Sequence, residues 1–365
     1  MSNSFSRVSA FKLIPVALLV GAIWVVSWLL IGRVAATHVS STPNLVSSPA
    51  PAMQNCADCH EEIVESFLTA PHANTLFPGA SVVERYAGLE FKNGDVTWRF
   101  SEKDGRLIAN CGSIEPFPVD WVFGSGTHAQ TPVRTVIEQD LDENKETESW
   151  ELAVSWYPTI GLGRTLGNNP TSTARTLGVF SQHAGTRQCF ECHTHYLPIE
   201  GKHINESAIK PGLHCARCHS DLDAHLQSEG QHPMERWSEL TPLESVRRCG
   251  ECHRRSDQMT SAELTPNNSL LIRFAGVGIE QSQCFQRQTD ALRMDCLTCH
   301  DPHRPSERSN AFFVEKCMNC HSPGQTQCRV EPESENCLDC HMPKVEIQKG
   351  LKFTDHWIRI RERGQ

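Results

Sequence analysis

Seven copies of the pentapeptide Cys-x-x-Cys-His dominate the chemistry available to this 365-residue chain. In each copy two thiols stand one helical turn apart, and the next residue adds an imidazole on the same side. This spacing suits covalent attachment of haem c, in which the thiols form thioethers with the porphyrin vinyl groups and the imidazole binds iron. We therefore expect seven covalently bound haem c groups.

Each motif supplies two attachment residues and one proximal iron ligand. The predicted attachment residues are Cys56, Cys59, Cys189, Cys192, Cys215, Cys218, Cys249, Cys252, Cys296, Cys299, Cys317, Cys320, Cys337 and Cys340. The predicted proximal ligands are His60, His193, His219, His253, His300, His321 and His341. Zinc ribbons are the alternative, because they also use Cys-x-x-Cys pairs. Zinc does not require a histidine directly after every second cysteine, so haem is favoured.

The sixth ligand of each iron must come from outside the motifs. Eleven further histidines exist, and all but His38 lie outside the linker described below, which leaves ten for seven irons. Ligation by histidine on both faces is therefore possible, and it would saturate the iron and favour electron transfer. Methionine ligation is the competing possibility, although no methionine has a context stronger than that of a gap-filling side chain.

The charge balance limits the possible partners. The chain has 34 Lys plus Arg against 43 Asp plus Glu, a formal net charge of −9. Nucleic acid is an unlikely partner, because binding phosphates requires a basic face. An acidic surface suits electrostatic steering of a basic redox protein, and it is equally typical of a solvated exported protein.

The N-terminal region reads as a membrane segment followed by a linker. Residues 13–32 carry no charge, and twenty helical residues span about 30 Å, the thickness of a bilayer core. We predict a retained signal anchor, with cleavage after the small residues 34–36 as the alternative. Basic residues in 1–12 keep that terminus cytoplasmic. The haem domain would then lie on the periplasmic side of the cytoplasmic membrane, joined by a flexible linker over 33–54.

The remaining chain divides into three parts. Residues 55–84 form a first haem segment, 85–188 a β-rich insert with a connection, and 189–365 a six-haem domain. Within about 85–160, Asn93-Gly94 and Asp104-Gly105 predict two hairpins, and alternation from Trp150 to Trp156 predicts one half-buried strand. The expected fold is a multihaem cytochrome c made mainly of short α-helices and loops packed on haems, with this β-rich insert and an N-terminal transmembrane helix.

Three cysteines lie outside the motifs. They are Cys111, Cys284 and Cys328. In an oxidising compartment a disulfide is the default for a leftover pair. Cys284 and Cys328 are the candidate pair because they bracket two haem motifs, and a free thiol next to haem is the alternative.

The C-terminal third resembles a known family. Residues 283–359 contain QCFQRQTDALRMDCLTCHDPH, CMNCH, CRVEPESENCLDCHMPK and FTDHWIRI. These segments resemble multihaem cytochromes c of the cytochrome c-552/4 type, which belong with nitrification electron carriers and pentahaem nitrite reductases. The similarity extends to LHCARCHSDLDAHL, CADCHEEIVESFLTAPHA and FGSGTHAQT. It implies stacked and perpendicular haem pairs.

The resemblance also ranks the candidate distal ligands. It marks five histidines that follow family patterns: His72, His128, His225, His303 and His356. Weaker candidates without such a context are His183, His195, His203, His214 and His232. The family's Gly-Pro-Gly after the CARCH motif is absent here, and no Cys-x-x-Cys-Lys motif of the nitrite reductases occurs.

Three functions are compatible with these features. The favoured one is an exported, membrane-anchored electron carrier that exchanges electrons with redox partner proteins, in preference to a catalytic oxidoreductase. The alternative is a multihaem reductase or oxidase of a small nitrogen or sulfur oxyanion at one five-coordinate haem, which needs acid–base groups above an open iron. A quinol dehydrogenase is the third possibility.

Overall fold

The structure is a computed structural model that describes residues 53–139, 144–167, 177–289, 292–305, 307, 309–321 and 337–359. The chain divides into two compact units, Met1–Thr42 and Pro43–Gln365, and every described residue belongs to the second. The predicted span over 13–32 lies outside the described residues. Among those described, no helix combines the length and apolar character needed to cross a membrane. The structure therefore gives no support to the predicted N-terminal transmembrane helix or to the membrane localisation built on it.

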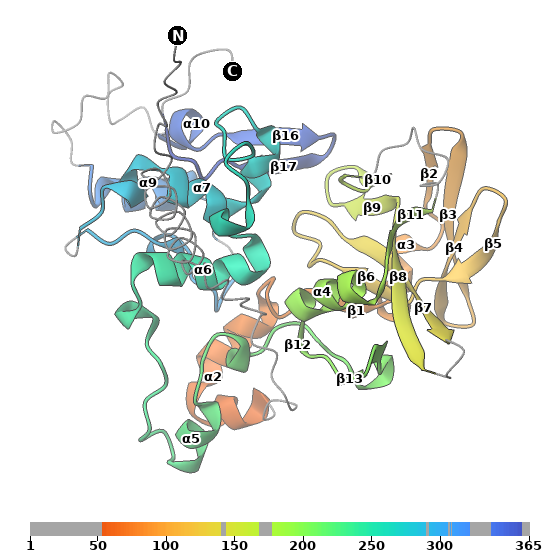
Figure 1. Ribbon diagram of the computed structural model, residues 1–365, viewed down its shortest axis with the longest axis horizontal. Helices are drawn as coiled ribbons and strands as arrows, with labels where there is room; N and C mark the ends of the chain where they lie inside the picture. Colours follow the sequence, from red (N-terminus) through yellow and green to blue (C-terminus); the bar gives the residue numbers. More distant parts are fainter. Residues whose placement is uncertain are drawn as a thin grey trace, which may run out of the picture. The chain divides into compact units, whose positions relative to one another are not determined.

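The described part of the chain is rich in strands, which corrects the expectation of mainly short helices and loops (Figure 1). It contains seventeen strands in six antiparallel sheets. The strands are β1 (Leu76–Pro78), β2 (Glu90–Asn93), β3 (Val96–Lys103), β4 (Arg106–Cys111), β5 (Ile114–Pro118), β6 (Trp121–Phe123), β7 (Thr131–Gln139), β8 (Lys145–Leu152), β9 (Val154–Tyr157), β10 (Gly161–Arg164), β11 (Gly178–Ser181), β12 (Thr194–Tyr196), β13 (Ile199–Glu200), β14 (His203–Ile204), β15 (Lys210–Pro211), β16 (Lys344–Gln348) and β17 (Leu351–Thr354).

Strands continue beyond the predicted insert because short hairpins form between the haem motifs and after the last of them. β13 pairs with β14 around Gly201, and β16 pairs with β17 around Gly350. Both glycines have positive φ, 65° and 80°, a conformation that glycine adopts without steric cost. The sequence analysis overlooked these hairpins because their strands are short and carry little period-2 pattern.

The two hairpins predicted inside the insert are present. β2 to β5 form a four-stranded sheet in sequence order. Asp104 and Gly105 between β3 and β4 both have positive φ, 53° and 72°, as a type I′ turn requires. Trp98 and Phe100 of β3 are buried with Tyr86 in the core of this sheet.

The strand predicted over 150–156 is instead split between two sheets. β8 lies in a five-stranded sheet of order β1-β6-β7-β8-β11, whereas β9 pairs with β10. The expected alternation fails because serines on the other face are also buried. Their hydroxyls are satisfied: Ser149 Oγ is 2.9 Å from Thr186 Oγ1, and Ser155 Oγ is 2.8 Å from Thr165 Oγ1. Buried hydroxyls are tolerated when they are hydrogen-bonded.

Short helices carry most of the motifs. The α-helices of the described part are α2 (Met53–Thr69), α3 (Val83–Tyr86), α4 (His183–His193), α5 (Leu222–Gln227), α6 (Pro242–His253), α7 (Ala275–Gln281), α8 (Gln283–Gln286), α9 (Asn310–Met318) and α10 (Cys337–His341). α6 begins with a capping box, in which the Thr241 side chain accepts from Glu244 N and the Glu244 side chain accepts from Thr241 N. Pro242 occupies its first turn, where proline's missing N–H costs nothing. α4, α6 and α10 each end on a motif histidine.

A second core fixes the helix of the second motif against the insert. Phe190 of α4 is fully buried. Its ring meets Trp121 edge-on at 5.7 Å and Phe123 at 5.0 Å, both in β6. The helix that ends at His193 is therefore held by the five-stranded sheet.

Candidate haem-binding site

All seven motifs fold as a helical turn. Those at 56, 189, 249 and 337 lie within α2, α4, α6 and α10. In the other three, the backbone N–H of the motif histidine donates to the carbonyl of the first cysteine: His219 to Cys215 at 2.8 Å, and His300 to Cys296 and His321 to Cys317 at 2.9 Å each. Residues three and four apart in a helix share one face, so each turn presents two thiols and an imidazole together, as haem c attachment requires.

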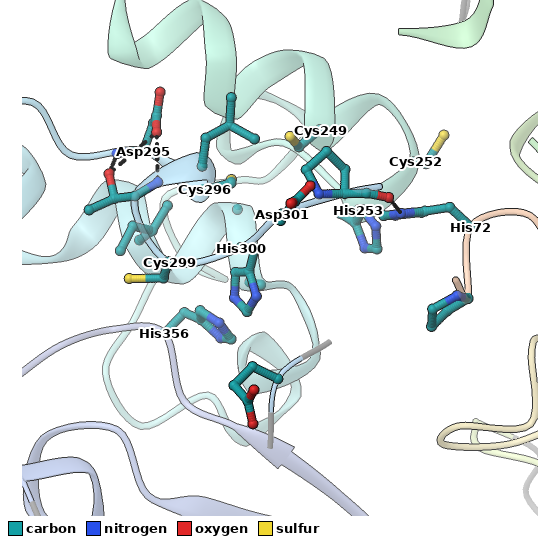
Figure 2. Close-up of a pocket in the computed structure, with 18 of the residues that line it drawn as sticks. His72, Cys249, Cys252, His253, Asp295, Cys296, Cys299, His300, Asp301 and His356 are labelled. Carbon is teal, nitrogen blue, oxygen red and sulfur yellow. Dashed lines mark hydrogen bonds between the residues drawn. The ribbon is translucent and has the colours of Figure 1, made fainter. Parts of the chain in front are cut away.

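Four motif histidines are each faced by a histidine from outside the motifs, as far as the described residues show. His60 faces His225 with ring centres 6.4 Å apart, and α2 and α5 lie side by side (Figure 1). The other pairs are His72 with His253 at 6.2 Å, His219 with His303 at 6.0 Å, and His300 with His356 at 6.2 Å. Figure 2 shows the last pair and His72 with His253 turned toward one another.

The spacing of these rings matches two imidazoles on one metal. Two imidazoles bound on opposite sides at about 2 Å place their ring centres roughly 6 Å apart. The angles between the ring planes differ: 17° for His60 with His225, 13° for His219 with His303, 40° for His300 with His356 and 79° for His72 with His253. The constant distance and variable angle are expected if an iron separates the rings, because ligation fixes the separation and not the rotation.

The Nδ1 atoms of these ligands are held by hydrogen bonds. Nδ1 of His225 is 2.7 Å from the His232 carbonyl, that of His356 is 3.0 Å from the Thr354 carbonyl, and that of His72 is 3.4 Å from the Pro302 carbonyl. Nδ1 of His303 instead meets the Asp301 carboxylate at 3.0 Å. Such bonds put the proton on Nδ1 and leave Nε2 to bind a metal.

A large cavity runs between the motifs. Its volume is about 4950 Å³, several times the roughly 300–1000 Å³ of a single-ligand pocket. Apolar side chains on its wall are open to it, among them Ile63 and Leu292, which are 49% and 56% exposed. A group of porphyrins would cover such surfaces, so the donor set, the cavity and its apolar wall all fit haem c.

The stronger and the weaker candidate ligands differ in whether they line this cavity. All five stronger candidates line it: His72, His128, His225, His303 and His356. The His128 ring stacks on that of Phe353, with ring centres 5.3 Å apart. Of the weaker candidates only His214 lines the cavity, while His183, His195, His203 and His232 do not.

Three weaker candidates are engaged elsewhere. His203 Nδ1 is 3.1 Å from Thr147 Oγ1 in β8. His214 Nδ1 accepts from Ala216 N at 3.2 Å, which in the neutral ring places the proton on Nε2. His195 lies 5.2 Å from His214, nearer than the ring pairs above. His232 contributes through its carbonyl, which orients His225.

The second motif differs from the four paired ones. His193 Nδ1 is 2.9 Å from the Thr75 carbonyl, so its Nε2 is available to iron. Its nearest recorded ring is Phe123, edge-on at 4.9 Å, and within the described ranges no imidazole faces it. His321 and His341 likewise have no opposing imidazole among the residues described. His341 Nδ1 meets the Arg359 carbonyl at 3.2 Å.

Thiols of different motifs are in contact. The Cys192 thiol lies close to that of Cys252, the Cys249 thiol close to that of Cys296, and the Cys215 thiol close to that of Cys56. These approaches place the first motif beside the third, and the fourth beside both the second and the fifth.

The described residues do not form the four-ligand clusters of structural zinc sites. The one group of three potential ligands found among them, Cys56, His214 and Cys215, mixes two motifs. This observation weighs against the zinc alternative. The predicted disulfide is a separate matter: Cys284 is a free thiol, and its proposed partner Cys328 lies outside the described residues.

Two charged side chains near the second motif carry no sequence signature. Glu151 of β8 is close enough to act electrostatically on both Cys189 and Arg273, and burial raises its pKa. Arg273 lies on the cavity wall, with its guanidinium 4.5 Å over the Phe274 ring. Arg254 lies over the same ring at 5.7 Å and is not on that wall. Sequence reasoning missed both residues because they lie far from any motif and meet only in the folded chain.

The relatives found in comparisons with known proteins include a distant one of defined activity. No protein-family model matches the chain, and no solved structure does. The dissimilatory sulfite reductase MccA of Wolinella succinogenes is 22% identical over 403 residues, an alignment that covers 88% of this chain and 54% of the relative. The chain thus spans about half the length of the curated protein it matches.

Proposed function

We propose that this protein is a multihaem c-type reductase of a sulfur oxyanion, with sulfite as the candidate substrate. The observation that carries the proposal is the contrast among the motifs. Four motif histidines face a second imidazole, whereas His193, His321 and His341 face none among the described residues. Of these three, His193 belongs to the motif that lies near Glu151 and its neighbour Arg273. A carrier needs only saturated irons, and a reductase needs one open position beside them. The distant relative is a sulfite reductase, which favours this function over a pure electron carrier.

The seven motifs would each hold one haem c, the group that supplies one-electron chemistry when bound. In each of the four histidine pairs the two imidazoles would hold one iron between them, which would keep substrate away from that iron. The thiol contacts join these sites to the second motif through Cys192 and Cys252. The protein's part is to hold the sites edge to edge and to supply electrons at His193.

Arg273 and Glu151 are suited to handle the substrate's charge and protons. The Arg273 guanidinium presents a fixed cation to the cavity, and guanidinium binds oxyanions with two parallel hydrogen bonds. Burial raises the pKa of Glu151, so its carboxyl keeps a proton to higher pH. Removing one oxygen from an oxyanion as water consumes two electrons and two protons, so a proton donor is required beside the electron source.

The expected partner of this acidic protein is a redox protein of opposite charge. The net charge of −9 suits a basic redox protein as electron donor.

The test is the spectrum of the haem-loaded protein and its response to sulfite. We expect a stoichiometric high-spin EPR signal in the oxidised protein that shifts when sulfite is added, and sulfite-dependent oxidation of reduced methyl viologen. Replacing His193 with alanine should remove that signal and leave the low-spin signals of the four pairs. If every haem is low-spin and sulfite changes neither spectrum nor viologen oxidation, the protein is an electron carrier and the proposal is wrong.

A further inference from the structure

The Nδ1 partner of His303 is unlike those of the other paired ligands. His72, His225 and His356 each direct Nδ1 at a backbone carbonyl, which is neutral. His303 directs Nδ1 at Oδ1 of Asp301, 3.0 Å away, and a carboxylate carries a full negative charge. Among the four paired sites, the one formed by His219 and His303 is therefore the site where the histidine from outside the motifs is hydrogen-bonded to an anion.

The Asp301 carboxylate is fixed in this position by three further features. Its Oδ1 also accepts the backbone N–H of His303 at 3.0 Å. Its Oδ2 pairs with Nε of Arg304 at 2.7 Å. The intervening Pro302 restricts the backbone between the two residues. The bond to the imidazole is thus a built feature of the turn, and not one rotamer of a mobile side chain.

A carboxylate at Nδ1 changes the ligand more than a carbonyl does. It draws the Nδ1 proton toward itself and makes Nε2 a stronger donor, an effect established for carboxylate–histidine–metal triads. A stronger donor stabilises the ferric state, which carries one more positive charge than the ferrous state, and hydrogen bonding around the ligand is one of the levers that set haem potentials.

We propose that Asp301 sets the reduction potential of the haem held by His219 and His303, and makes it the lowest of the four histidine-paired haems. The step concerned is a one-electron exchange in which ferric iron becomes ferrous, no bond is broken, and the proton stays on Nδ1 of His303. Arg304 acts in the opposite sense, because its guanidinium withdraws charge from the same carboxylate. This inference rests on the ligand pairing described under the proposed function.

The third motif, which would hold this haem, lies next to the fourth motif, so a low potential there would direct electrons toward the fourth motif. Cys218 of the same motif lies close to Cys249 of the fourth motif, and Cys252 of that motif contacts Cys192. An electron held at low potential at the third motif would pass downhill to the fourth and then reach His193. Asp301 would thereby bias the direction of flow toward the proposed reduction site.

The experiment is a redox titration of the haem-loaded full chain followed by EPR. The angle between the imidazole planes governs the low-spin signal, so the two near-parallel pairs, at 13° and 17°, are distinguishable from the pairs at 40° and 79°. In Asp301→Asn we expect one near-parallel component to shift its ferric-to-ferrous ratio by about tenfold, or about 59 mV upward for one electron. Asparagine still accepts the His303 backbone N–H, so the turn should persist. Arg304→Gln should shift the same component downward.

The control is Asp58→Asn in the first motif. Asp58 is exposed, and its Oδ1 accepts from Gln54 Nε2 and not from a histidine. The Asp58→Asn substitution removes the same charge beside a different haem. It should leave unchanged the potential of the EPR component that Asp301→Asn shifts. The inference is overturned if Asp301→Asn shifts no component, or shifts all of them equally as a change of net charge would. If the native protein lacks near-parallel low-spin signals, the ligand pairing itself fails, which is a separate result.

Discussion

The carbonyl oxygen of Thr75 accepts a hydrogen bond from Nδ1 of His193 at 2.9 Å, and the Thr75 hydroxyl returns one to the His193 carbonyl at 2.8 Å. The His193 carbonyl also accepts a hydrogen bond from the backbone N–H of Gly212 at 3.0 Å. The next residue, Leu213, donates its backbone N–H to the His72 carbonyl at 2.9 Å. One small set of backbone bonds therefore fixes both His193 and His72. The positions of His193 and His72 are therefore mechanically coupled.

Thr75→Val should loosen His193 without removing the Nδ1 bond. Valine keeps the shape of threonine and loses only the hydroxyl that donates to His193 O. A hydrogen bond of this kind contributes about 1 kcal/mol to stability, so the free energy of unfolding should fall by about that amount. Denaturant unfolding measures it. Thr75→Ser, which keeps the hydroxyl, should behave as the native protein, and equal losses in both variants would assign the effect to packing.

Gly212→Ala should disturb His72 and His193 together. A Cβ at Gly212, where φ is +79°, would lie 2.0 Å from the Ala73 carbonyl oxygen, so the backbone must move. Gly201→Ala is the matched control, because Gly201 has φ +65° and open space around its Cβ position. We expect a cost of about 1–2 kcal/mol at Gly201 from the left-handed conformation alone, and a clearly larger one at Gly212. Only Gly212→Ala should alter the EPR signal of the His72 and His253 haem. Equal costs at both positions would contradict the close approach.

His72→Gln should open one iron. Its ring faces His253 at 79°, so the low-spin signal of that near-perpendicular pair should disappear from the EPR spectrum and a high-spin signal should replace it. His183→Gln, in a histidine that does not line the cavity, should leave the spectrum unchanged. Loss of the same signal in both variants would show that the pairing is not as described.

Asp120 should make stability depend on pH in the acid range. Burial raises the pKa of Asp120 to about 6, with Glu206 adding to the shift and the Thr135 N–H and Arg106 opposing it. The unfolded pKa is about 3.9, so the folded state binds the proton more tightly. The protonated carboxyl therefore contributes stability below pH about 4, and this contribution is lost as pH rises through about 6. The shift of about two units corresponds to at most about 3 kcal/mol.

Asp120→Asn should remove this pH dependence, because asparagine does not titrate. Relative to the native protein, the variant should gain up to about 3 kcal/mol of stability between pH 4 and 7, measured by unfolding at several pH values. Glu102→Gln, at an exposed position of β3, should show no comparable change. A parallel pH profile for native protein and Asp120→Asn would refute the assignment.

Arg273→Gln should weaken sulfite binding more than electron delivery. Losing a charge-assisted hydrogen bond costs about 1.5–3 kcal/mol, so KM for sulfite should rise about 10- to 100-fold, with a smaller change in kcat. Arg254→Gln removes the other guanidinium from the Phe274 ring and leaves the cavity wall intact, so its KM should stay near the native value. Identical kinetics for the two variants would exclude Arg273 from substrate binding.

The sequence alone located the attachment chemistry, because Cys-x-x-Cys-His is a local pattern and one helical turn is enough to bring its three side chains together. The turns at Asn93-Gly94 and Asp104-Gly105 were predictable for the same reason, because short turn sequences favour the positive φ found at Gly94, Asp104 and Gly105. Beyond such local signals the prediction failed. The short strands β12 to β17 have no strong periodicity, and the serines of β8 and β9 are buried because of hydroxyl partners that are distant in sequence.

Only the tertiary structure decided which histidine faces which. His60 and His225, or His72 and His253, come from helices and turns separated by the whole insert, and nothing in their local sequence encodes the partner. The resemblance to multihaem cytochromes selected the five stronger candidate ligands. The fold places four of them face to face with a motif histidine, whereas His128 stacks on Phe353. The pairing of Asp301 with His303 and the approach of Glu151 to Arg273 belong to the fold as well. Ligation and electrostatics act through space, so they depend on how distant segments pack and not on the order of residues along the chain.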